Sequence, residues 1–274
     1  MPFSSDGHAA DDVFERRFLK SAGHRISLAV ADPPVATTVP VVAIHGFGTS
    51  GYRTYRHIAR QLFDAGVPLY APDLPGFGES DAPDVEYSLH YYARSVARLC
   101  NELGLHRPII IGHSMGGKVA AATAVLYEDE LSGLGLINSG GFSPAERVLP
   151  FIAGSSTFHS LLRQDWFYHG IVPRTPLAPI LQTEDNRLQL ERLRYSHHRL
   201  DLRRAGLQRR LLTLRLPTLI LWGEHDRLLP RRTPLVIQKY LRHAHLRFVR
   251  GAGHAPMKDQ PDAVAREIIL FTHH

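Results

Sequence analysis

Short apolar runs recur along the chain and alternate with stretches of helical periodicity. Six short, mainly apolar runs lie at 39–44, 68–71, 108–111, 134–137, 218–221 and 246–249. Such runs are typical of strands in a parallel sheet that is covered on both faces. Helical stretches between and after them cover about 52–65, 88–103, 115–128, 232–242 and 261–271. The alternation predicts a doubly wound, mostly parallel α/β sheet.

The pattern is different near the N-terminus. Residues 14–19 and 25–30 alternate between polar and apolar positions, and the turn Ser21-Ala22-Gly23 separates them. A period of two with a short glycine-containing turn predicts a hairpin. We therefore expect antiparallel strands at one edge of the sheet.

The alternation of strand and helix stops between residues 142 and 215. Five prolines break this stretch, no part of it resembles a strand, and leucines recur through 184–216 at helical spacing. We therefore expect residues 1–141 and 216–274 to form an α/β core, and residues 142–215 to form a helical cap inserted into it.

The net charge of +6 is concentrated in this predicted cap. Residues 142–215 contain twelve arginines, six acidic residues and no lysine, whereas the rest of the chain is neutral. A basic balance can indicate nucleic-acid binding. Because the excess is confined to one segment without a nucleic-acid motif, we expect no nucleic-acid partner. A solvated helical face or a preference for anionic substrates explains the arginines.

The composition is that of a globular protein, with 274 residues of which 44% are hydrophobic. The one cysteine, Cys100, excludes an internal disulfide and favours a cytoplasmic location. Asp6, Asp11 and Asp12 interrupt any signal-peptide core. No window approaches the roughly 18 apolar residues of a membrane span, so we expect no stable membrane insertion.

The strongest chemical signal is Gly112-His113-Ser114-Met115-Gly116, between an apolar run and a helix of small residues. A serine between two glycines at such a junction is the nucleophile-elbow pattern. The glycines are needed because strand and helix backbones come so close that a Cβ at either position would clash. The pattern predicts Ser114 as a nucleophile whose hydroxyl lies at a helix N-terminus.

A serine needs a base to take its proton, and the base needs a carboxylate to orient it. Asp226 lies just past the run at 218–221, and His254 follows a glycine-rich loop after the run at 246–249. Ligand sites in parallel sheets collect at the carboxyl ends of strands. Ser114, Asp226 and His254 are therefore the predicted catalytic residues, with Glu224 as a weaker candidate for the acid.

An acyl-transfer site also needs two N–H donors for the developing oxyanion. Ile44-His45-Gly46-Phe47-Gly48 follows an apolar run, and the amides of Phe47 and Met115 are the candidate donors. A simple glycine-rich turn would look the same at this position. Further residues expected near the substrate are His45, Gly46, His113 and Asn138, together with Trp166 and Phe167 of an aromatic cluster in the cap.

Together these motifs resemble those of the α/β-hydrolase fold superfamily. They are HGFG at 45–48, DLPGFGES at 73–80, GHSMGG at 112–117, WGEHDRLLP at 222–230 and GAGHAPM at 251–257. The resemblance covers the chain except the predicted cap. It implies an α/β-hydrolase fold in which Ser114 is the nucleophile, His254 the base, Asp226 its orienting acid, and Phe47 and Met115 the oxyanion hole.

The nucleophile narrows the chemistry that the resemblance implies. Members that attack alkyl carbon have aspartate at the elbow, whereas Ser114 favours attack on an acyl carbonyl. We therefore expect a serine hydrolase that cleaves a small or medium ester, thioester or lactone with an apolar acyl part through an acyl-enzyme, with no cofactor and no metal.

Two alternatives stay open. One is a carbon–carbon hydrolase of diketone ring-fission products, or a related synthase or cyclase. Similar diketone hydrolases usually have asparagine where His113 stands, which weakens that reading. The other is a member of the fold that binds a small ligand without hydrolysing it.

Overall fold

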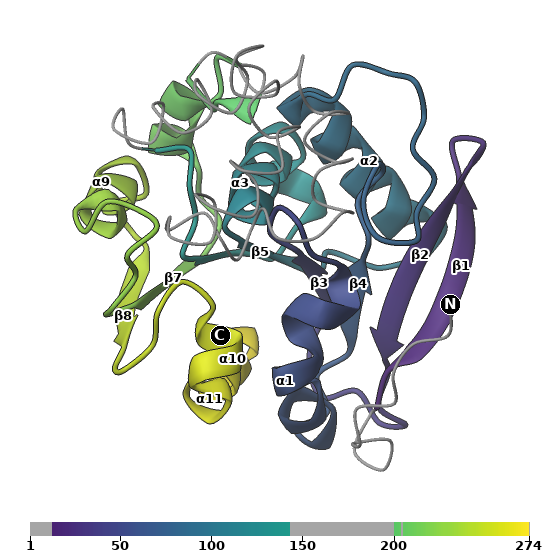
Figure 1. The fold of residues 1–274 in the computed structure, drawn as a ribbon, viewed down its shortest axis with the longest axis horizontal. Helices are drawn as coiled ribbons and strands as arrows, with labels where there is room; N and C mark the ends of the chain where they lie inside the picture. Colours follow the sequence, from purple (N-terminus) through teal and green to yellow (C-terminus); the bar gives the residue numbers. More distant parts are fainter. Residues whose placement is uncertain (1–12, 143–199, 204, 274) are drawn as a thin grey trace, which may run out of the picture.

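The computed structural model describes residues 13–142, 200–203 and 205–273. Its centre is an eight-stranded sheet in the order β1-β2-β4-β3-β5-β6-β7-β8 (Figure 1). The strands are β1 Glu15–Ser21, β2 His24–Ala31, β3 Val41–Ile44, β4 Leu69–Pro72, β5 Ile109–His113, β6 Gly133–Ile137, β7 Thr218–Gly223 and β8 His245–Val249.

The pairing confirms the predicted sheet. β1 pairs with β2 as an antiparallel hairpin, β2 pairs antiparallel with β4, and every pair from β4 to β8 is parallel. The hairpin turns at Ala22 and Gly23, both of which have positive φ. β3, β5, β6 and β7 lie in the interior of the sheet and are buried along their whole length, as their continuous apolar runs predict.

Helices cover both faces of the sheet (Figure 1). α2, α3 and α9 lie on one face, and α1, α10 and α11 lie on the other. Ile110 of β5 belongs to the core beneath α2 and α3, whereas its neighbours Ile109 and Ile111 belong to the core beneath α1 and α11. The helices are α1 Gly51–Asp64, α2 Leu89–Glu102, α3 Met115–Leu126, α9 Thr233–Tyr240, α10 Pro256–Asp259 and α11 Pro261–Thr272.

Local sequence explains where these helices begin. Ser50 and Ser88 cap α1 and α2 by accepting hydrogen bonds from the amides of Arg53 and Tyr91. α3 has no side-chain cap, and the residue before it is Ser114. Its small residues are almost all buried, which allows this helix to lie close to the sheet.

Most of the predicted cap, residues 143–199, lies outside the described residues, so the domain boundaries stay a prediction. From Leu200 onward the chain packs through buried leucines into the core beneath α3 and α9. Helices were expected up to residue 216, but from Leu200 the structure has turns and then a 3-10 helix, η5, at Gln208–Thr213. Gly206, with φ of 72°, and the extended Leu214 account for this difference, because neither conformation continues an α-helix.

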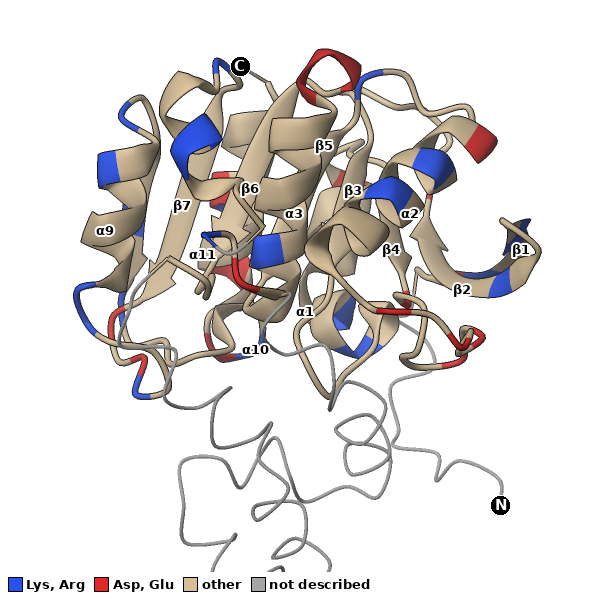
Figure 2. Cartoon of the chain, turned by 90° about the horizontal axis from the view of Figure 1, so that it is seen from above, with Lys and Arg blue, Asp and Glu red and all other residues tan. Residues whose placement is uncertain are grey.

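Charged residues of both signs are spread over the helices, the loops and β1 of the described core (Figure 2). This mixed distribution agrees with the neutrality of the chain outside residues 142–215. None of the helices in the described part of the chain is long and apolar enough to cross a membrane.

Candidate active site

Ser114 lies between the last residue of β5 and the first residue of α3, with a backbone φ of 54°. This conformation is strained for a residue with a side chain. A Cβ added at Gly112 would lie 2.2 Å from the Gly116 carbonyl oxygen. One added at Gly116 would lie 2.3 Å from the Ile44 carbonyl oxygen. The prediction that both positions require glycine is confirmed, and the tight turn places Ser114 at the carboxyl edge of the sheet.

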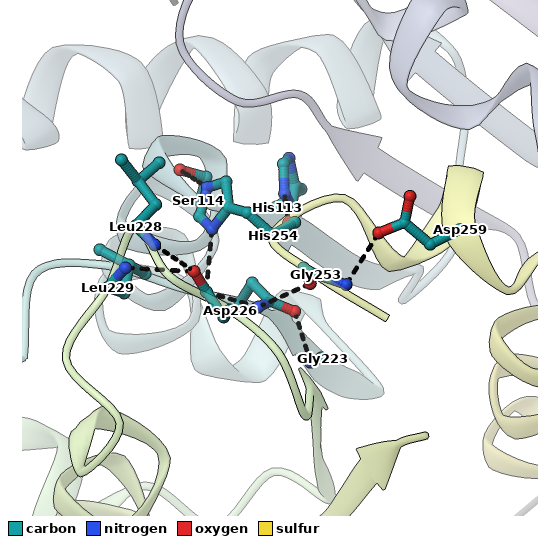
Figure 3. Close-up of polar contacts among 10 residues, drawn as sticks. His113, Ser114, Gly223, Asp226, Leu228, Leu229, Gly253, His254 and Asp259 are labelled. Carbon is teal, nitrogen blue, oxygen red and sulfur yellow. Dashed lines mark hydrogen bonds and ion pairs between the residues drawn. The ribbon is translucent and has the colours of Figure 1, made fainter. Parts of the chain in front are cut away.

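Ser114, His254 and Asp226 point toward one another at this edge (Figure 3). His254 Nε2 lies 3.0 Å from Ser114 Oγ, and His254 Nδ1 lies 2.9 Å from Asp226 Oδ2. Because an ionised carboxylate only accepts hydrogen bonds, Nδ1 carries the proton and Nε2 is free to accept one from the serine. Residues far apart in the chain thus form one continuous hydrogen-bonded path.

Asp226 is enclosed by donors. Its side chain is fully buried. Oδ1 accepts from the amides of Leu228 and Leu229 at 2.8 and 3.1 Å, while Oδ2 accepts from Asn138 Nδ2 at 2.6 Å in addition to His254. Burial by itself would raise the Asp226 pKa, but the hydrogen bonds, first that of His254, outweigh it and the pKa lies below its ordinary value. Asp226 is therefore held as a carboxylate.

The weaker candidate acid, Glu224, is exposed and lies outside this path. Within the described part of the chain, its Oε2 accepts one long hydrogen bond, of 3.4 Å, from the amide of Gly251. The geometry thus places Asp226, and not Glu224, against the histidine.

Two further contacts fix the loop that carries His254. The Gly253 amide donates to Asp259 Oδ2 at 2.8 Å (Figure 3). His113 Nε2 lies 2.7 Å from the His254 carbonyl oxygen. Asp259 ends α10, a helix of four residues that was not expected from the sequence. Pro256 at its first position is the signal that could have revealed this helix.

The glycine-rich loop after β3 lies against the serine turn. A Cβ added at Gly46 would lie 3.4 Å from Ser114 Cβ, and Phe47 follows it directly. Phe47 packs edge-on against Phe77, with ring centroids 5.9 Å apart. Met115 begins α3, so its amide is among the first N–H groups of the helix, which have no acceptor within it. Met115 thus follows Ser114 directly, Phe47 follows a residue that lies against Ser114, and their role as oxyanion donors stays a prediction.

His45, one of the predicted substrate contacts, is buried within the protein. Its side chain is fully buried, Nδ1 donates to the Gly46 carbonyl at 2.6 Å, and Nε2 accepts from the Leu74 amide at 3.0 Å. Burial lowers its pKa below the ordinary value, which keeps the ring neutral. Both ring nitrogens are thus hydrogen bonded within the protein, and a substrate contact of His45 stays a prediction. Its ring ties the loop after β3 to the loop after β4.

The other predicted substrate contacts fall into two groups, those buried at the site and those outside the described residues. Asn138 and His113 lie at the site but are buried, and each is hydrogen bonded to the catalytic loops instead of facing outward. Trp166 and Phe167 lie outside the described residues. Among the described residues, no group of three His, Cys, Asp or Glu side chains could hold a metal ion.

Comparison with known proteins gives the family. Residues 41–267 match the model of the alpha/beta hydrolase family. Lipase 1 of Psychrobacter immobilis is 28% identical over 85% of this chain and 76% of its own. The pimeloyl-[acyl-carrier protein] methyl ester esterase of Edwardsiella ictaluri is 30% identical over 84% of this chain and 92% of its own.

Solved structures are similar to this chain as well. A thermophilic esterase from Thermogutta terrifontis matches 93% of this chain and 96% of its own, with a TM-score of 0.70 and 26% identity. The fold, the family model and these relatives lead to one conclusion: the chain belongs to the alpha/beta hydrolase family.

Proposed function

We propose that the protein is a serine hydrolase that cleaves a small or medium ester, thioester or lactone with an apolar acyl part. The observation that carries the proposal is the path from Ser114 Oγ through His254 to Asp226, with contacts of 3.0 and 2.9 Å. The relatives named as a lipase and as esterases support ester hydrolysis in particular.

The first half of the reaction forms an acyl-enzyme. His254 Nε2 takes the Ser114 proton as Oγ bonds to the substrate carbonyl carbon, and the carbonyl electron pair moves onto oxygen. The amides of Phe47 and Met115 stabilise this oxyanion. When the carbonyl re-forms, the bond to the leaving group breaks, and that group takes the proton from His254.

The second half repeats the steps with water. His254 takes a proton from water as its oxygen bonds to the acyl carbon, and the oxyanion forms again. When the carbonyl re-forms, the acid leaves and Ser114 regains its proton from His254. Asp226 stays ionised throughout and stabilises the imidazolium that forms twice in each cycle.

A serine-reactive phosphonate tests the nucleophile directly. We expect one label per chain, located on Ser114 by peptide mapping, and no label on Ser114→Ala. Ser95→Ala is the matched control, because Ser95 lies on α2, where its hydroxyl donates to the Tyr91 carbonyl. Unchanged labelling of Ser114→Ala would refute the assignment.

The substrate class needs a panel of compounds. p-Nitrophenyl esters of graded acyl length, a thioester, a lactone and a ring-fission diketone would be assayed side by side. Turnover of the esters with no cleavage of the diketone supports the proposal. Preferred cleavage of the diketone would favour the carbon–carbon hydrolase alternative, and tight retention of ligand without turnover would favour the binding protein.

A further inference from the structure

Asn138 connects the ends of three neighbouring strands. It follows β6, its side chain is fully buried, and its φ of 41° is unusual for a residue other than glycine. Its Oδ1 accepts from the Gly223 amide at the end of β7 at 2.9 Å. Its Nδ2 lies 2.6 Å from Asp226 Oδ2 and 3.4 Å from the carbonyl oxygen of Gly253, which precedes His254.

The contact with Gly223 determines the orientation of the side-chain amide of Asn138. The Gly223 N–H needs an acceptor, so the side-chain oxygen of Asn138 must face it. The NH₂ group then necessarily faces Asp226 and Gly253, both of which offer only acceptors here. The backbone of Asn138 is held as well, because its N–H donates to the Leu221 carbonyl at 2.9 Å.

The oxygen that Asn138 contacts is the one that orients the base. Asp226 Oδ2 accepts from both Asn138 and His254, while Oδ1 is occupied by two backbone amides. A carboxylate in this position could rotate or shift if one of these donors were lost. The Asn138 hydrogen bond thus restricts the oxygen to the direction in which it meets His254 Nδ1.

We infer that Asn138 is a positioning residue that fixes the Asp226 carboxylate and the His254 loop relative to each other. This role replaces the substrate contact expected for Asn138, because a fully buried side chain with both polar groups occupied has nothing to offer a ligand. The inference rests on the proposed function, since it assumes that Asp226 and His254 act on Ser114.

Asn138→Leu tests the role by removing the donor while keeping similar volume. The loss of a hydrogen bond to a buried carboxylate predicts a fall in kcat of about 10- to 100-fold, with KM nearly unchanged. Thr218→Val is the matched control, because Thr218 is a buried polar residue at the far end of β7 whose hydroxyl donates to the Leu216 carbonyl. It should leave kcat unchanged even if it lowers stability.

Asn138→Asp gives a readout that a merely structural residue would not produce. Two carboxyl groups this close share one proton, and the protonated one can donate to Asp226 as the amide does. Once that proton is lost, the two charges repel and the orientation of Asp226 is lost. The activity of the variant relative to wild type should therefore be highest at low pH and fall as pH rises.

The outcomes separate this inference from the proposed function. A wild type that is inert to esters and to the phosphonate overturns both. Labelling and turnover that depend on Ser114, together with unchanged kcat in Asn138→Leu or a pH-independent activity ratio in Asn138→Asp, overturn the positioning role alone. A raised KM with unchanged kcat would restore a substrate contact. If Asn138→Leu does not fold, the pH dependence of Asn138→Asp decides.

Discussion

The ring of His113 donates from Nε2 to the carbonyl oxygen of His254, at 2.7 Å. The residue directly before Ser114 therefore holds the loop of His254, 141 positions later in the chain. A carbonyl only accepts, so the proton is on Nε2 and Nδ1 is bare. Nδ1 is buried and has no hydrogen-bond partner among the described residues. Burial, reinforced by the nearby His254, lowers the His113 pKa to about 3.

This neutral, buried ring should make the protein sensitive to mild acid. In the unfolded chain His113 gains a proton below its ordinary pKa of 6.5, whereas in the folded protein it does so only near 3. The contribution of neutral His113 to the free energy of unfolding is thus complete above pH 6.5 and is lost as pH falls toward 3. Between pH 7 and 5, wild type should lose about 2 kcal/mol more stability than His113→Gln.

Urea unfolding at the two pH values measures this difference. His90→Gln, which removes an exposed histidine from α2, is the control and should behave as wild type does. An equal loss of stability in wild type and His113→Gln would contradict the assignment of the acid sensitivity to His113.

Asp226→Asn should lower kcat by about 10⁴-fold while the protein stays folded, because an amide cannot hold His254 in the required tautomer. Glu224→Gln, two residues earlier, should keep nearly full activity. Steady-state kinetics on one activated ester, with circular dichroism to verify folding, compare the two. Comparable losses in both variants would mean that the acid has been misassigned.

Gly112→Ala should destabilise the fold by about 3 kcal/mol or more, because the new methyl group meets a backbone carbonyl that cannot move aside. Gly133→Ala on β6 is the matched control. Its methyl would meet the ring of Phe271 at 3.1 Å, and a side chain can shift. Denaturant midpoints measure the stability of both variants. A similar loss of stability in the two would argue against the clash with the backbone carbonyl.

The arginines of residues 142–215 are explained either by a solvated surface or by a preference for anionic esters, and salt distinguishes the two. If they attract the substrate, KM for a negatively charged ester should rise as salt is raised from about 0.05 to 0.5 M, since screening weakens the attraction. A neutral ester of the same length is the control. Equal salt dependence for the two esters would leave the arginines as a solvated surface.

The strands and the serine turn were predictable because their signals are local. A run such as that of β5 is apolar at consecutive positions, and Gly112 and Gly116 lie two residues from Ser114. Their steric reason is confirmed by the contacts of the two glycines. α10 was missed because four residues are too few for a period to show.

The roles of Asn138 and His45 could not be read from the sequence. A single polar residue after an apolar strand is compatible with a turn, a ligand contact or a buried hydrogen bond. The choice depends on which strand ends lie beside it, and the order β5-β6-β7-β8 emerges only in the folded sheet. For most of the predicted cap, sequence and structure cannot be compared, because residues 143–199 lie outside those described.

The strand order has a consequence for how the site can vary. The strands that lead to Ser114 and Asp226, β5 and β7, are not neighbours, because β6 runs between them. Two strand spacings amount to about 10 Å, and one imidazole with a hydrogen bond at each side crosses that interval. The spacing of the strands thus sets the distance that the side chains of Ser114, His254 and Asp226 have to span. Loops around the site can change in length and composition without altering this interval, whereas a strand inserted between β5 and β7 would exceed the reach of any histidine.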